Sequence, residues 1–316
     1  MTLEDGQRQH DSEPLSRNEL EERANSVLAL FAQKSVKILG DMIREGQGRH
    51  VLGSVPERLE DEQLGIDAIG ENILGRAVEK LGLPCLILGE HNQFRYVNAS
   101  GETPHVILPT DPFDNSSEYK RGLDTPPYAV TGAYHSDGKP IGAVVADLRN
   151  EMVYVTVKGQ THRIDLRTGE KEPIKKSERT TLLDDNATLA TYLGSNQYSV
   201  GFWEIFSGMI KAMPPKAKLY AGGGAFIYAP LAAGAVDAYV MFKEPRTEID
   251  PGLPLALAAG CTIVSVNPDG TFEDYKFDPD LHGHGKIDLL VAACTPEVRD
   301  EIIRYYLQYL QSLKAA

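Results

Sequence analysis

The spacing of apolar residues predicts two amphipathic helices near the start of the chain. Apolar residues recur at near-helical intervals over residues 20–43, and Ser16 is suited to cap the beginning of this helix. Asp67 opens a second segment of this kind, in which Ile73 belongs to the apolar face. The intervening residues 49–64 are charged and show no periodic pattern, so we expect a connector there.

Two apolar runs that lack helical spacing predict strands. They cover residues 81–90 and 106–111, and an acidic residue closes each run, Glu90 in the first and Asp111 in the second. The two carboxylates are therefore expected at strand ends.

A longer stretch of apolar runs and turns, residues 128–157, predicts antiparallel strands. The pair Asp137-Gly138 is a strong hairpin signal, and the turn around Gly169 indicates a further small hairpin. Hairpins of this kind favour an α+β protein with a mixed, largely antiparallel sheet over a doubly wound one.

Beyond residue 185, strands and helices alternate, which is typical of a smaller α/β half. The predicted segments are a strand over 187–193, a helix over 201–212, a strand–glycine turn–helix–strand unit over 218–242, a helix over 253–259, strands over 261–266 and 287–294, and a helix over 296–313.

A basic and polar connector, residues 171–179, precedes this change of pattern. We therefore predict a mobile tail over residues 1–15, an N-terminal α+β sub-domain with the metal site over 16–184, and a C-terminal α/β sub-domain over 185–316 that contributes Asp250 and substrate loops.

Composition narrows the function. The chain has 316 residues, of which 42% are hydrophobic, and a formal net charge of −13. This charge argues against nucleic acid or an anionic membrane as the main partner. No apolar run reaches membrane-spanning length, no signal peptide is visible, and the three cysteines stand singly, so we expect a cytoplasmic protein with reduced thiols.

The stretch Asp111-Pro-Phe-Asp114 is the candidate metal site. Pro112 fixes its own φ and keeps Asp111 extended, so the two carboxylates and the Phe113 carbonyl can converge beyond the strand. Such hard oxygens suit Mg²⁺. Taken alone, the tetrapeptide favours an ordinary Asp-Pro turn followed by a helix cap, because Asp-Pro-x-Asp occurs often by chance.

Two further motifs have simpler interpretations. The glycines at 222–224 stand at a strand-to-helix junction, where a ligand could approach the backbone, but they match neither a Walker sequence nor a dinucleotide fingerprint. His282-Gly-His284 lacks a third ligand nearby and is predicted to be a loop rather than a metal site.

The set and order of acidic motifs resemble a known superfamily. Asp67, Glu90, Asp111-Pro-x-Asp114 and Asp250 before an Ala/Leu-rich helix are similar to the pattern of the Mg²⁺-dependent, lithium-sensitive sugar phosphatases of the inositol monophosphatase and fructose-1,6-bisphosphatase superfamily. The resemblance covers about residues 17–305. It implies a layered α-β-α-β-α fold, and its members are commonly dimers or tetramers.

The resemblance implies a ligand set for two or three Mg²⁺ ions, for which Mn²⁺ can substitute. Glu90 and Asp111, with the Phe113 carbonyl, would hold the first ion. Asp111, Asp114 and Asp250 would hold the second, so that Asp111 bridges the two ions.

The resemblance also implies roles in binding and hydrolysing a small phosphorylated substrate. Asp67 and the Ser116 hydroxyl would position the attacking water, and the N–H groups of Asn115 and Ser116 would bind the phosphate. Residues of the glycine turn would contact the sugar, namely Gly223, Gly224 and Ala225.

Several positions depart from the family pattern. His91 replaces a second acid, Asn115 replaces a glycine but tolerates positive φ, and Pro251 follows the late acid. Glu244 and Glu248 are candidates for holding a sugar hydroxyl. These departures leave open fructose-1,6-bisphosphatase-type activity, or a catalytically weak member kept for binding or assembly.

Overall fold

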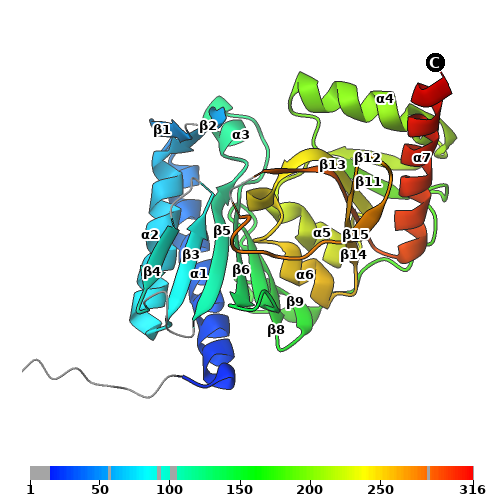
Figure 1. Ribbon diagram of the computed structural model, residues 1–316. Helices are drawn as coiled ribbons and strands as arrows, with labels where there is room; N and C mark the ends of the chain where they lie inside the picture. Colours follow the sequence, from blue (N-terminus) through cyan, green and yellow to red (C-terminus); the bar gives the residue numbers. More distant parts are fainter. Residues whose placement is uncertain (1–14, 56–57, 91–93, 100–104, 283–284, 316) are drawn as a thin grey trace, which may run out of the picture.

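The computed structural model describes residues 15–55, 58–90, 94–99, 105–282 and 285–315 (Figure 1). Except for Leu15, the predicted tail lies outside these residues. The helices and helical turns are α1 (Arg17–Arg44), α2 (Gly65–Leu81), α3 (Ser116–Arg121), α4 (Asn196–Ala212), η1 (Ala225–Ile227), α5 (Tyr228–Ala232), η2 (Arg246–Glu248), α6 (Leu253–Ala258) and α7 (Pro296–Ala315).

Helix α1 begins at the predicted cap. The Ser16 hydroxyl accepts a hydrogen bond from the N–H of Glu19 at 3.4 Å, and the Glu19 carboxylate accepts one from the Ser16 N–H at 2.8 Å. This reciprocal pair satisfies two N–H groups that the first turn would otherwise leave free. The buried side chains of α1, among them Leu28 and Phe31, belong to the core beneath the first large sheet.

The first large sheet has eight strands in the order β10-β9-β8-β7-β6-β5-β3-β4. Their bounds are β3 (Cys85–Gly89), β4 (Phe94–Val97), β5 (Val106–Asp114), β6 (Tyr128–His135), β7 (Pro140–Asp147), β8 (Met152–Val157), β9 (Gln160–Asp165) and β10 (Lys171–Pro173). The β3–β5 pair is parallel and the other pairs are antiparallel. The hairpin turns at Gly138 and Gly169 have the positive φ that glycine allows, which confirms both predicted hairpins.

The prediction of a connector over residues 49–64 is wrong. This segment forms β1 (Val51–Val55) and β2 (Arg58–Leu64), which pair with each other as a separate antiparallel ribbon. Its sequence lacks the alternation of apolar and polar residues from which strands are predicted.

The second large sheet has six strands in the order β12-β11-β13-β16-β14-β15. Their bounds are β11 (Thr188–Thr191), β12 (Lys218–Ala221), β13 (Ala238–Pro245), β14 (Thr262–Val266), β15 (Phe272–Asp274) and β16 (Lys286–Ala293). Strand β11 is parallel to both β12 and β13, while the remaining pairs are antiparallel. Helix α4 begins at Asn196, ahead of the predicted start at residue 201.

The layers confirm the predicted α-β-α-β-α fold (Figure 1). Helices α1 and α2 share a core with one face of the first sheet. Helices α5 and α6 lie between the two sheets, in a core that contains Val130 of β6 and Tyr239 of β13. Helices α4 and α7 cover the outer face of the second sheet. The two sheets fall on either side of the predicted division at residue 184, which remains a prediction of domain organisation.

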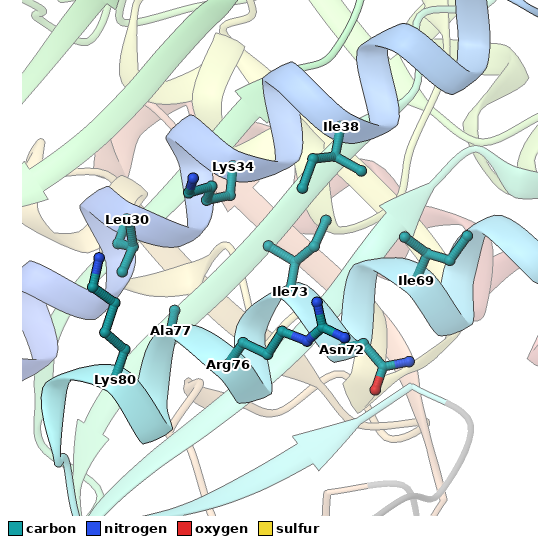
Figure 2. Close-up of a pocket in the computed structure, with 9 residues that line it drawn as sticks. All are labelled: Leu30, Lys34, Ile38, Ile69, Asn72, Ile73, Arg76, Ala77 and Lys80. Carbon is teal, nitrogen blue, oxygen red and sulfur yellow. The ribbon is translucent and has the colours of Figure 1, made fainter.

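A groove runs between α1 and α2 on the outside of the helical layer (Figure 2). Apolar side chains of both helices, including Leu30 and Ile73, line it, and three basic side chains stand along it: Lys34, Arg76 and Lys80.

Among the helices that the structure describes, none combines the length and the apolar character that crossing a membrane requires.

Candidate metal centre

The irregular end of β5 carries the two carboxylates of the Asp-Pro-x-Asp motif. The strand continues past its predicted end to Asp114, but its register with β6 shifts between Asp111 and Asp114. Pro112 has no N–H to give to the ladder, and the N–H of Phe113 donates to Asp111 Oδ1 at 3.1 Å instead. The backbone therefore leaves regular pairing at the motif itself.

A third carboxylate joins these two from a distant part of the chain. Oxygen atoms of Asp111, Asp114 and Glu248 lie within 4.8 Å of one another. We call these three residues the acidic group. Asp111 and Asp114 are buried and Glu248 is half-buried at the end of η2. Their closeness is the spacing at which carboxylates can share a cation.

The electrostatics of the acidic group favour a bound cation. Burial raises the pKa of Asp111 well above its usual range, and the neighbouring charges of Glu90, Asp114 and Glu248 raise it further. Burial also raises the pKa of Asp114 to about 8, although a backbone N–H bond offsets part of the effect. Ionising these carboxylates together is costly without a positive charge, which divalent cations would supply.

The glycine turn packs directly on the acidic group. The N–H of Phe226 donates to Asp114 Oδ2 at 2.7 Å. A Cβ atom at Gly224 would lie 2.7 Å from Asp114 Oδ1, and Gly224 has a φ of +120°. At Gly223, a Cβ would lie 2.5 Å from the Tyr239 hydroxyl oxygen. The turn was predicted to let a substrate approach the backbone, and here it also leaves room for the Asp114 carboxylate.

Replacing Gly224 with alanine is therefore expected to lower the free energy of unfolding by about 2 kcal/mol or more, since the backbone conformation is one that L residues rarely adopt. The displaced Asp114 carboxylate should also weaken metal binding. Urea unfolding and Mn²⁺ titration measure the two effects. Gly208→Ala is the control, because Gly208 lies in exposed helix with nothing within 4 Å of a Cβ. Equal unfolding midpoints for Gly224→Ala and the unmodified protein would contradict the expectation.

Asp67 and Glu90 lie close to the acidic group. Asp67 is in the first turn of α2, where its carboxylate accepts the N–H of Leu64 as a helix cap. Burial raises the pKa of Asp67 to about 8, the Leu64 bond lowers it, and Glu90 raises it. Glu90 follows β3 and also raises the pKa of Asp111 and Asp114. The predicted acids Asp67, Glu90, Asp111 and Asp114 therefore converge in one place.

The segment after the motif turns as the sequence predicted. Asn115 precedes α3 with a φ of +71°, and its side-chain amide donates to the Pro126 carbonyl at 3.0 Å. Ser116 is the first residue of α3 and is half-buried. Phosphate binding by Asn115 and Ser116, metal binding by the Phe113 carbonyl and substrate binding by Ala225 remain predictions.

Asp250, which was predicted to be a metal ligand, lies outside the acidic group. Its Oδ1 accepts the Tyr275 hydroxyl at 2.8 Å, and its Oδ2 lies 2.7 Å from His282 Nδ1. Both oxygens are thus engaged within the protein. The acidic group contains Glu248 instead, which the sequence suggested only as a candidate for holding a sugar hydroxyl.

This difference from the prediction has a geometric origin. Thr247-Glu-Ile-Asp250 contains two acids two residues apart, and residues at that spacing on a helical turn do not face the same side. The sequence did contain a signal, namely the two acids Glu248 and Asp250 at this spacing. Because they cannot both face the acidic group, only one of them could be predicted to join it. His282 lies in a turn, as predicted, and its side chain is buried there. His91 and His284 lie outside the described residues.

Comparisons with known proteins agree with this geometry. The model of the inositol monophosphatase family matches residues 65–305. No curated protein sequence matches the chain.

Solved structures share the fold. The extragenic suppressor protein SuhB of Bartonella henselae is 16% identical, with a TM-score of 0.66 over 89% of this chain and 96% of that one. The inositol monophosphatase of Anabaena is 15% identical, with a TM-score of 0.65 over 91% and 96% of the two chains. An IMPase from Thermotoga maritima is 17% identical, with a TM-score of 0.64 over 90% and 96%.

At these identities the structural matches show the fold, while the family match spans most of the chain and includes Asp67, Glu90 and the acidic group. Together they support a phosphatase, and therefore a hydrolase. The chain belongs to the inositol monophosphatase family.

Proposed function

We propose that this protein is a Mg²⁺-dependent phosphate monoester hydrolase that acts on a small sugar, inositol or nucleotide-derived phosphate. The observation that carries the proposal is the acidic group, whose oxygens from β5 and η2 lie within 4.8 Å of one another. Asp67 and Glu90 beside it supply two further carboxylates.

The donor set fits Mg²⁺, or Mn²⁺ in its place. Carboxylate oxygens are the hard ligands that these ions prefer, and the group contains neither cysteine nor histidine. Glu90 and Asp111 would hold one ion, and the acidic group a second. When bound, such ions acidify a water molecule and neutralise the phosphate oxygens.

The remaining residues would orient the reactants. Asp67 would hold the attacking water and accept its proton, helped by the Ser116 hydroxyl. The N–H groups of Asn115 and Ser116 would bind the phosphate, because they open α3 directly after Asp114. The glycine turn, which touches Asp114 at Gly224, would contact the sugar.

Phosphate release from a panel of sugar, inositol and nucleotide phosphates, with and without Mg²⁺, tests the proposal. We expect release from at least one compound with Mg²⁺ and none after chelation. Metal binding without release from any compound would favour the alternative of a protein kept for binding. Release that is indifferent to chelation would contradict the proposed metal dependence.

The raised pKa values predict how metal-free stability depends on pH. Asp67 and Asp114 have pKa values of about 8 when folded, far above the ordinary value of 3.8. Between pH 4 and pH 8 the folded state therefore holds protons that the unfolded state has released, so stability falls as pH rises, by up to about 1.4 kcal/mol per pH unit for each group.

Thermal unfolding in a chelator at pH 5.5, 7 and 8.5 measures this dependence. We expect the melting temperature to fall across the series, and added Mg²⁺ to raise it most at pH 8.5, where the carboxylates are free of protons. If the chelated protein instead gains stability from pH 5.5 to 8.5, the pKa values of Asp67 and Asp114 are not raised by folding.

A further inference from the structure

A buried hydrogen-bonded cluster stands directly behind Glu248. Asp250 joins the Tyr275 hydroxyl, at 2.8 Å, to His282 Nδ1, at 2.7 Å. Asp250 and His282 are fully buried, and Tyr275 is 5% exposed. We call these three residues the anchoring cluster.

The anchoring cluster ties down the turn that carries Glu248 from both sides. Asp250 follows Glu248 by two residues and binds Tyr275. Arg246 precedes Glu248 by two residues and donates to the Tyr275 hydroxyl at 3.1 Å and to the Lys276 carbonyl at 3.3 Å. Both flanks of Glu248 are therefore bonded to one segment, the residues that follow β15.

The same turn is also fixed to the sheet that carries the other ligands. The Tyr134 hydroxyl of β6 donates to the Asp250 carbonyl at 2.6 Å, and a Cβ at Gly132 would lie 2.9 Å from that carbonyl. The ring of Phe277 stacks on Tyr134 with centroids 3.9 Å apart. Strand β6 pairs with β5 at Asp111. The position of Glu248 relative to Asp111 is thus set through Asp250.

One polar atom of the anchoring cluster has no hydrogen-bond partner among the described residues, and its burial lowers the stability of the fold. His282 Nε2 is buried and has no hydrogen-bond partner among the described residues. A buried unpaired nitrogen destabilises the fold, whereas an apolar residue at this position would not. The contact between His282 Nδ1 and Asp250 Oδ2 is therefore a polar contact through which this ring can offset that cost.

Resting on the proposed function, we propose that Asp250, Tyr275 and His282 are positioning residues that hold Glu248 within the acidic group and thereby set the affinity for the divalent cation. They do not touch the cation themselves. Residues behind metal ligands commonly act in this way, and changing one typically weakens metal binding by about 10–100-fold.

The test is a Mn²⁺ titration of the full chain, followed by electron paramagnetic resonance of the free ion. Asp250→Asn keeps the size of the side chain and removes its charge. Tyr275→Phe keeps the ring and removes the hydroxyl, which makes it the milder variant if Asp250→Asn folds poorly. We expect the Mn²⁺ dissociation constant to rise by at least about tenfold in Asp250→Asn, and less in Tyr275→Phe.

Glu301→Gln is the matched control for lost stability. Glu301 is also a buried carboxylate that anchors a loop, since it accepts the Leu182 N–H at 2.7 Å and the Thr181 hydroxyl at 3.0 Å. Its helix, α7, lies on the outer face of the second sheet. We expect this variant to melt at a lower temperature and to bind Mn²⁺ with unchanged affinity.

A second measurement separates positioning from general damage. At saturating Mg²⁺, kcat of Asp250→Asn should return to within a few-fold of the unmodified protein, while the Mg²⁺ concentration for half-activation stays raised. Unchanged Mn²⁺ affinity in both variants would overturn the inference. If the unmodified protein binds Mn²⁺ but releases no phosphate, the proposed function fails, while the shifted Mn²⁺ affinity still supports the inference. No Mn²⁺ binding by the unmodified protein would overturn both.

Discussion

Replacing Asp111 with asparagine is expected to reduce Mg²⁺-dependent phosphate release by about a thousandfold or more. Asp111 belongs to the acidic group, and the charges of Glu90, Asp114 and Glu248 all raise its pKa. In the proposed site, Asp111 would bridge two cations. Loss of a bridging carboxylate removes part of both sites, and about 4 kcal/mol of lost transition-state stabilisation corresponds to that factor.

The same substitution should stabilise the metal-free protein. Without a cation, the Asp111 carboxyl must either stay ionised beside the other acids or take up a proton that the unfolded chain has released, and both cost stability. The amide is neutral without a proton, so the chelated variant is expected to melt at a higher temperature than the chelated unmodified protein. Initial rates and melting curves with and without Mg²⁺ measure both effects. Asp237→Asn is the control, because Asp237 is a buried carboxylate paired with Arg179 outside the acidic group. Equal rates for Asp111→Asn and the unmodified protein would refute the site.

Replacing Glu248 with glutamine is expected to cost about a hundredfold in activity at limiting Mg²⁺, because even residues behind a metal ligand commonly cost 10–100-fold. The expectation follows from the place of Glu248 in the acidic group, where its carboxylate oxygen lies within 4.8 Å of oxygens of Asp111 and Asp114. The amide retains one oxygen but carries no charge, so it would hold a cation weakly. Isothermal titration with Mn²⁺ and the Mg²⁺ dependence of the rate measure the loss.

The response to high Mg²⁺ distinguishes Glu248 from the residue two positions later. Glu248→Gln should remain impaired at saturating Mg²⁺, since a ligand is missing, whereas Asp250→Asn should recover. Glu301→Gln again controls for lost stability. The assignment of Glu248 fails if Glu248→Gln keeps full Mn²⁺ affinity while Asp250→Asn loses it.

Local sequence signals predicted the elements that depend on local interactions. The capping pair at Ser16 and Glu19 marks the start of α1 because both partners lie within one helical turn. Positive φ at Asn115 could be predicted because few residues other than glycine tolerate it as well. The convergence of Asp111 and Asp114 followed from the proline between them.

Contacts between distant segments were beyond the reach of those signals. The closeness of Gly224 to Asp114 joins residues 110 positions apart, and only the packing of the two sheets brings them together. The β1–β2 ribbon was missed because residues 49–64 show no periodic apolar pattern. Whether Glu248 or Asp250 joins the acidic group depends on the contacts of Asp250 with Tyr275 and Tyr134. These contacts link distant segments, so the spacing of residues along the chain could not predict them.

The sequence by itself determined the layered α+β fold, the family and the acids at the ends of β3 and β5. Hydrophobic periodicity, turn chemistry and motif order determine these features, and all three can be read from the order of residues along the chain. Only the tertiary structure decided that Glu248 completes the acidic group and that Asp250 stands behind it. The physical reason is that a carboxylate faces a cation site or a buried partner according to the orientation of its turn, and contacts with remote strands set that orientation.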